Sequence, residues 1–278
     1  MREHGVNTQA NAAATPSDRQ RHPLARGIEI ITLMVESGEQ SYGVRDLGTR
    51  LGVSASTAHR LLGDLEELGM VSRTPAGNYR LGMEFLRLAW TASARFPIRE
   101  AANDVLAELS DQSGESSFFA VYNEQRRRLM FAVSVESPHP LRYTVPQGVW
   151  LPLHAGASGL AILAFLPEKV QDEIAHGALE ALTERTLVDA GKLAERLAQI
   201  RRDGYALSHG ERIDGAIAIA APVKGPAEVV IGDVGITIPE TRFNATKTTE
   251  LTELVKESAA LLTHRFTGAR LEPAHIGA

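Results

Sequence analysis

The segment SASTAHRLLGDLEEL, residues 54–68, constrains the fold more than any other part of the chain. At 100° per residue, its apolar side chains gather on one side of a helix and its small, polar and cationic ones on the other. The apolar side comprises Ala58, Leu61, Leu62, Leu65 and Leu68, and the opposite side comprises Ser56, His59, Arg60 and Gly63. This pattern predicts a helix that packs through one face and presents the other to a partner.

The flanking sequence predicts a winged helix over residues 24–82. Upstream, VRDLGTRLGV has helical apolar spacing, Gly52 suits a tight turn and Ser54 suits an N-cap. Downstream, Gly69 ends the second helix, and MVSR and NYRL flank a TPAG loop that can close a two-stranded ribbon. A further helix is expected at 24–37, and its predicted apolar stripe is Leu24, Ile28, Ile31 and Val35.

A DNA major groove admits one helix, whose first residues reach base edges and phosphates. The predicted DNA contacts are Arg45, Ser54, Ser56, Thr57, His59, Arg60, Arg73 and Asn78. The alternative is a winged helix that binds protein and whose polar face is merely solvated. Residues 24–82 hold six arginines against seven acidic residues, so one copy should bind weakly and two or more should be needed.

Composition limits the remaining possibilities. With 278 residues and 44% hydrophobic content, the chain suffices for about two domains, and its net charge of −5 excludes a general polyanion binder. Cysteine is absent, which excludes disulfides, cysteine-based zinc sites and thiol nucleophiles. No run approaches the roughly 18 apolar residues of a membrane span, so we expect a cytoplasmic protein without a membrane partner.

The predicted organisation has five parts. Residues 1–23 and 268–278 are expected to be tails, the first of them disordered because it lacks a sustained period. The mostly apolar MEFLRLAWTASA predicts a linker helix over 83–96 that packs on the rest of the chain or on a second copy. Residues 97–267 form the second domain.

The sequence of that second domain contains segments with the apolar periodicity of strands and segments with that of helices. Strands are expected at 116–122, 129–135, 141–145, 149–153, 215–223 and 228–238. Helices are expected at 98–114, 156–166, 190–204 and 246–266. Consecutive hairpins with the helices set apart indicate an α+β or α/β sensor domain on a mainly antiparallel sheet.

Three motifs, STAHRLLGDLEELGMV, LPLHAGASGLAILAFLP and GYALSHGERIDGAIAIAAPV, occur in this order. Together they resemble the IclR family of bacterial transcriptional regulators over nearly all of residues 24–266. The resemblance implies a winged helix-turn-helix, a linker helix and a GAF-like effector-binding domain. It also implies a homodimer or dimer of dimers on palindromic, double-stranded promoter DNA.

The resemblance places the effector pocket at the second and third motifs. The expected lining is Trp150, Leu151, Leu153, Gly156, Ala157, Ser158, Ser208, Ala218, Gly235 and Thr237. Family members that bind small keto acids have an acid, a cysteine and two serines around the ligand. At the matching positions this chain has Ser208, Ala218, Gly235 and Thr237. We therefore expect a bulkier or more apolar small organic acid, with an aromatic acid favoured, held by the N–H groups at 156–158. The alternative is that Trp150 and Leu153 are simply packed core.

The predicted function is a ligand-responsive DNA-binding regulator of a catabolic operon, and repression is favoured over activation. The alternative is a small-molecule enzyme with an accessory winged helix. Gly156 to Gly159 invites a nucleophile-elbow interpretation, but Leu160 stands where that motif needs glycine. The histidines lack metal-ligand spacing and no phosphate-binding loop occurs. No catalytic residue, metal or cofactor is therefore expected.

Overall fold

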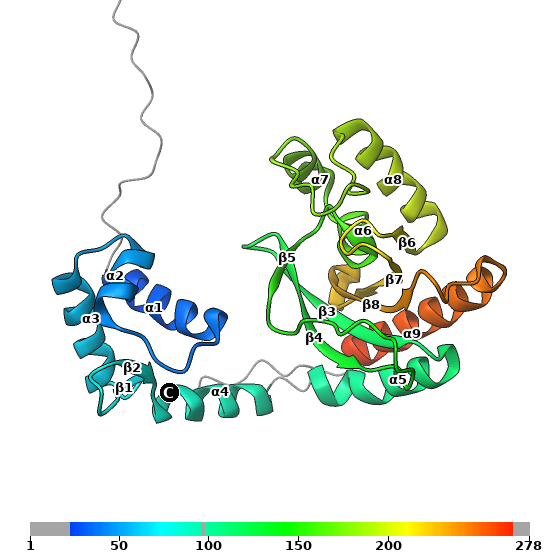
Figure 1. Cartoon of the computed structure of the whole chain (residues 1–278). Coiled ribbons are helices and arrows are strands. Elements are labelled where there is room, and N and C mark those ends of the chain that lie inside the picture. Colours follow the sequence, from blue (N-terminus) through cyan, green and yellow to red (C-terminus); the bar gives the residue numbers. More distant parts are fainter. Residues whose placement is uncertain (1–22, 96–97, 269–278) are drawn as a thin grey trace, which may run out of the picture. The chain divides into compact units, whose positions relative to one another are not determined.

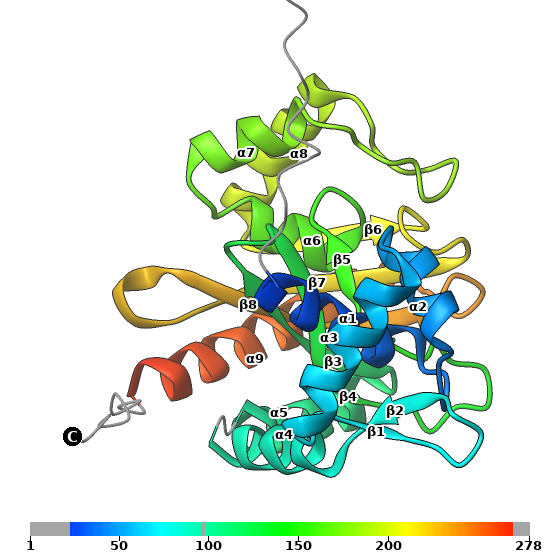
Figure 2. The same ribbon diagram turned by 90° about the vertical axis from the view of Figure 1, so that its left-hand side faces the viewer.

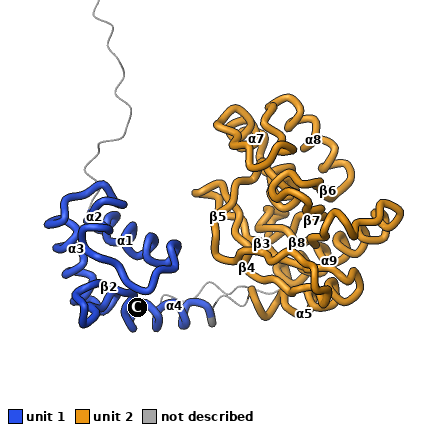
Figure 3. Tube along the Cα trace, viewed as in Figure 1, with its two compact units in different colours: residues 1–94 blue, residues 95–278 orange. Residues whose placement is uncertain are grey.

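The computed structural model describes residues 23–95 and 98–268, in two units that divide the chain at residues 94 and 95 (Figures 1 and 3). The predicted tails lie outside the described residues, apart from Pro23 and Gly268. The predicted linker helix is α4, Met83–Arg95, which begins within the first unit.

The first unit is a winged helix. Its elements are α1 Pro23–Ser37, α2 Val44–Leu51, α3 Ala55–Glu67, β1 Val71–Arg73, β2 Tyr79–Leu81 and α4. Gly52 turns the chain between α2 and α3 with a left-handed φ of 63°, and the Ser54 hydroxyl caps α3 by accepting from the Thr57 amide at 3.2 Å. β1 and β2 pair antiparallel, with Ser72 opposite Arg80.

The apolar stripe predicted for α1 is wrong in its orientation. Leu24, Ile28 and Val35 are exposed, whereas the core takes Ile31 together with the neighbouring Ile30 and Met34. Helix α3 approaches α1 at a glycine: a Cβ on Gly27 would lie 3.8 Å from a methyl carbon of Leu65. The face of α1 that packs on α3 therefore carries residues 27, 30, 31 and 34.

Leu68 is also exposed instead of buried. Helix α3 ends at Glu67, and Gly69 turns the backbone with a φ of 68°. A Cβ on Gly82 would lie 2.1 Å from the Gly69 carbonyl oxygen, so the exit of the wing packs directly on this turn. Leu68 therefore follows the end of the helical stripe and does not reach the core.

The second unit is built on a six-stranded sheet in the order β5-β4-β3-β8-β7-β6, with every neighbouring pair antiparallel (Figures 1 and 2). Its strands are β3 Ser116–Asn123, β4 Arg128–Val135, β5 Trp150–Pro152, β6 Ala206–His209, β7 Ala216–Lys224 and β8 Val230–Pro239. Its helices are α5 Ile98–Ser113, α6 Gly156–Leu163, α7 Glu168–Ala175, α8 Ala190–Asp203 and α9 Thr248–Gly268, with short 3₁₀ turns η1 Pro226–Glu228 and η2 Ala245–Lys247.

Helices cover both faces of this sheet. α5 and α9 pack against one face, and α6 packs against the other with α8 and then α7 outside it. Along β8, Val234, Ile236 and Ile238 join the α5 and α9 core. Because side chains alternate along a strand, Asp233, Gly235 and Thr237 face α6.

One predicted strand is absent, since residues 141–145 form no ladder. The free edge of β4 pairs instead with β5, which places Leu129 opposite Leu151. Side chains anchor the intervening segment: Arg142 forms an ion pair with Glu136 at 2.6 Å, and the Tyr143 hydroxyl donates to the Asp214 carbonyl at 3.0 Å. Helix α7 lies in a region for which the sequence yielded no prediction.

Candidate functional site

Helix α3 exposes the polar face that the sequence predicted. Ser56, His59 and Arg60 are exposed, and Thr57 is half-buried beside the capping Ser54. Arg60 lies 3.5 Å from the Asp64 carboxylate one turn along the helix, with 60% of each side chain exposed. A long, exposed ion pair of this kind is weak, so the guanidinium can turn toward a phosphate or base.

The remaining predicted DNA contacts lie on α2 and the wing. Arg45 is exposed on α2, and Arg73 is exposed at the end of β1, with its guanidinium 5.8 Å from the centre of the Tyr79 ring. Asn78 is half-buried, and its amide oxygen would lie 3.8 Å from a Cβ on Gly43 at the start of α2. Arg50 differs because it pairs with Glu39 at 2.8 Å and Asp46 at 3.1 Å, and both partners raise its pKa.

In the second unit, a cavity of about 20 Å3 lies beside the first turn of α6. Its lining is Gly156, Ala157, Ser158, Ser208, Arg212, Ile213, Ala216, Ala218 and Thr237. The sheet register explains how distant residues meet, because Ser208 lies opposite Ala218, which in turn lies opposite Thr237. Six of the ten expected effector residues therefore line one cavity, which has room for about one water molecule as it stands.

The other four expected residues lie outside this lining. Trp150 and Leu151 are on β5, where the Arg126 guanidinium lies 5.4 Å from the centre of the Trp150 ring. Leu153 is buried in the core. Gly235 lies two residues before Thr237 on β8, and a Cβ there would be 2.8 Å from the ring of Phe118.

The glycines around Ser158 have packing roles. A Cβ on Gly159 would lie 2.4 Å from the Leu153 carbonyl oxygen, so only glycine lets α6 approach the end of β5. Gly156 begins the helix with a left-handed φ of 81°. This geometry explains the glycine spacing without a nucleophile elbow.

The N-terminus of α6 is already close to a carboxylate of the protein itself. The backbone N–H groups of Gly156 and His209 donate toward Glu211, and together with Arg196 they favour its charged form. Burial has the larger effect and raises the pKa of Glu211. An anion entering the cavity would therefore compete with the Glu211 carboxylate for the Gly156 amide.

Sequence reasoning missed two charged residues in this region, Arg212 and Asp233. Arg212 lines the cavity, and its guanidinium lies 4.8 Å from the centre of the Phe131 ring. Asp233 is completely buried, which raises its pKa from 3.8 to about 7, and nearby Ser158 and Arg212 only partly offset this. The signal was a single acid within the apolar strand sequence VVIGDVGITI.

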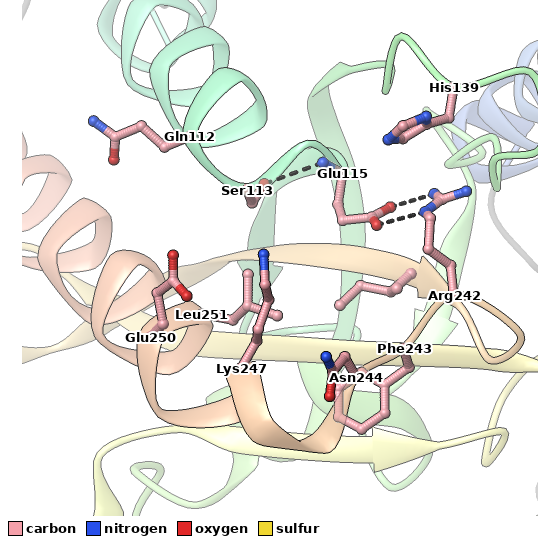
Figure 4. A pocket seen from close by; sticks show the side chains of 11 residues that line it. Gln112, Ser113, Glu115, His139, Arg242, Phe243, Asn244, Lys247, Glu250 and Leu251 are labelled. Carbon is pink, nitrogen blue, oxygen red and sulfur yellow. Dashed lines mark hydrogen bonds and ion pairs between the residues drawn. The ribbon is translucent and has the colours of Figure 1, made fainter.

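A larger pocket of about 310 Å3 lies at the start of α9, and Figure 4 shows its lining. Arg242 donates to both carboxylate oxygens of Glu115 and, through Nη1, to the Leu141 carbonyl. His139 and Lys247 also line this pocket. Because its buried carboxylate and its guanidinium satisfy each other, this pocket indicates a ligand less strongly than the cavity at α6.

The part of the chain that the structure describes contains neither a metal-binding cluster nor a membrane-spanning helix. No group of three or more histidine, aspartate or glutamate side chains is placed to hold a metal ion. No helix within 23–95 or 98–268 has both the length and the apolar content needed to cross a membrane.

Comparison with known proteins identifies both units. The profile of the IclR helix-turn-helix domain matches residues 23–75, and that of the bacterial transcriptional regulator IclR C-terminal domain matches residues 91–264. The glycerol operon regulatory protein of Streptomyces griseus is 31% identical over 255 residues, covering 91% of this chain and 99% of that protein. The transcriptional repressor IclR of Escherichia coli K12 is 28% identical over 260 residues, covering 93% and 94%.

A solved structure has the same fold. The crystal structure of a putative IclR transcriptional regulator from Silicibacter sp. TM1040 superimposes with a TM-score of 0.76 at 28% identity. The match covers 87% of this chain and 97% of that one. Fold and sequence comparisons therefore agree over both units.

Proposed function

Because the chain belongs to the IclR family of bacterial transcriptional regulators, we propose that it represses a catabolic operon and that a small organic acid controls its operator affinity. Family membership decides between the two classes that the sequence left open, because the chain is a transcriptional regulator and not an enzyme. Repression and operon control are supported by the names of relatives, a repressor and a glycerol operon regulator.

The observation that carries this proposal is the presence on one chain of an exposed helix α3 and, in the other unit, a small cavity lined by polar side chains. Ser56, His59 and Arg60 project from the first two turns of α3, where side chains enter a major groove. Arg45 and Arg73 add exposed positive charge for the phosphate backbone. The DNA contacts are thus proposed for residues that the fold leaves accessible.

The effector is proposed to bind in the cavity at α6, among Ser158, Ser208 and Thr237. Its volume of about 20 Å3 is too small for an organic acid, so side chains must move when the ligand enters. The acid can change operator affinity only if it binds one arrangement of the dimer more tightly than the other, and the ratio of these two affinities limits the size of the change.

A homodimer or dimer of dimers is proposed to present two copies of α3 to successive major grooves. Helix α4 supports this assembly because Trp90 is 67% exposed and Leu88 is 44% exposed on an otherwise regular helix. The exposed α1 residues Ile28 and Val35 provide a second apolar surface in the same unit.

The proposal is tested by selecting binding sites from random double-stranded DNA with the full chain and then measuring affinity for the selected site. Arg60→Ala should weaken binding by about 5- to 150-fold, the loss expected for one base-reading arginine. Arg99→Ala, which removes an exposed arginine from α5, is the control and should bind as the wild type does. Failure to select any sequence, or equal affinity of both variants at matched salt, would contradict this role of α3.

A further inference from the structure

The buried side-chain atoms that lack a hydrogen-bond partner all lie around one place in the described part of the chain. They are Ser158 Oγ, Glu211 Oε2, Arg212 Nη1 and both carboxylate oxygens of Asp233. Buried polar groups in proteins are almost always paired, because an unpaired one loses its hydration without compensation. A concentration of unpaired groups of both charges therefore indicates a site shaped for a polar ligand.

Arg212 extends from the loop between β6 and β7 across the start of α6. Its Cβ would lie 3.2 Å from a Cβ on Gly156, and its guanidinium reaches the face of Phe131 on β4. The backbone beside it is fixed, because Thr183 and Thr186 donate to the carbonyls of Gly210 and Glu211 at 2.8 and 2.7 Å. The loop thus holds its position while the long side chain of Arg212 occupies part of the cavity.

Asp233 faces the same side of the sheet from β8, in line with Gly235 and Thr237. Ser158 and the positive charge of Arg212 lie close enough to favour the charged form of Asp233, yet neither side chain forms a hydrogen bond with it within 3.5 Å. At Gly235, between Asp233 and Thr237 on the strand, a Cβ would lie 2.8 Å from the ring of Phe118, so this ring packs against β8 there. The Arg212 guanidinium and the Asp233 carboxyl group lie near each other without a hydrogen bond between them. A ligand could therefore accept hydrogen bonds from Arg212 and donate one to Asp233.

We propose that Arg212 and Asp233 determine effector specificity, and that the effector is a carboxylic acid that also carries a hydrogen-bond donor. The carboxylate pairs with the Arg212 guanidinium, and a hydroxyl or ammonium group donates to Asp233. The edge-on pair of Phe118 and Phe131, with ring centres 5.0 Å apart, supplies an apolar wall for the body of the ligand. This inference rests on the effector cavity of the proposed function and specifies the ligand that it selects.

The test uses matched acids on the full chain, with dissociation constants measured by calorimetry. One set is benzoate, 4-hydroxybenzoate and 4-(aminomethyl)benzoate, and the other is propionate, lactate and alanine. Within at least one set, a donor-bearing acid should bind about tenfold or more tightly than its parent. Arg212→Gln should weaken all the acids that bind by about tenfold or more.

Three further variants make the assignment specific. Arg212→Lys keeps the charge without the planar fork and should restore part of the affinity. Asp233→Leu should remove the preference for the donor, whereas Asp233→Asn should retain it for a hydroxyl and lose it for an ammonium group. Arg126→Gln, which removes the arginine over Trp150 outside the cavity, is the control and should bind as the wild type does.

The inference is overturned if no acid of either set binds, if the donor makes no difference, or if Arg212→Gln binds as the wild type does. Circular dichroism confirms that each variant is folded. Affinity for the selected DNA, measured in parallel, keeps the two proposals separate. A chain that binds DNA but none of the acids loses this inference alone, whereas one that binds the acids as expected without any change in DNA affinity loses the proposed function.

Discussion

Replacing Asp233 with asparagine is expected to change how the stability of the second unit depends on pH. The folded protein holds the Asp233 proton up to a pKa of about 7, whereas the unfolded chain releases it near 3.8. Between these values the folded state binds more protons, so the contribution of Asp233 to stability is greatest below pH 3.8 and falls as pH rises toward 7. At 1.36 kcal/mol per pH unit, the total loss is about 4 kcal/mol.

The variant Asp233→Asn has no proton to release and should lack this loss. Relative to the wild type, its free energy of unfolding should therefore increase by about 3 kcal/mol between pH 5 and pH 8. Urea unfolding followed by tryptophan fluorescence measures the difference. Trp90 and Trp150 are the two tryptophans of the chain, so a Trp90→Phe background lets Trp150 report on the second unit alone.

Asp104 provides the control of opposite sign. Hydrogen bonds from Arg265 lower its pKa, so its stabilisation is lost as pH falls and not as it rises. Asp104→Asn should thus show no gain over the wild type between pH 5 and pH 8. If the wild type and Asp233→Asn gave parallel curves over that range, Asp233 would not be the buried, unpaired acid described here.

Two further predictions concern packing and assembly. Gly159→Ala should destabilise the second unit by about 1–3 kcal/mol in urea unfolding, because its Cβ overlaps the Leu153 carbonyl oxygen. Gly63→Ala on α3, where nothing lies within 4 Å, should stabilise the first unit by about 0.5–1 kcal/mol, and equal effects of the two changes would refute this packing argument. Trp90→Asp should shift the chain toward monomer in sedimentation velocity, and an unchanged assembly would remove Trp90 from the interface.

The sequence predicted those parts of the fold that depend on local backbone geometry, such as helix caps and turns. Ser54 caps α3 and Gly52 makes the turn before it, because these residue types satisfy a helix start and a left-handed φ without help from the rest of the protein. Pairing in the sheet brought Ser208, Ala218 and Thr237 together as expected from the family resemblance. Their role in binding stays a prediction.

Tertiary packing decided what the sequence could not. Helix α1 is apolar over a wide arc, and its packing against α2, α3 and β2 determines which part is buried. The apolar sequence around Asp233 predicts a buried strand, which is correct, but the lack of a hydrogen-bond partner for Asp233 follows only from its neighbours on β3, β7 and α6. Arg212 lies in a loop whose direction no periodicity specifies.

The most direct test of the account is the coupling between acid binding and DNA binding. The affinity of the wild type for its selected DNA is measured with and without a saturating amount of the acid that binds best, at one salt concentration. We predict a change of about 5- to 150-fold, and the same factor must appear when DNA alters the affinity for the acid. An acid that binds equally well to free and DNA-bound protein would contradict the claim that the cavity at α6 controls the operator.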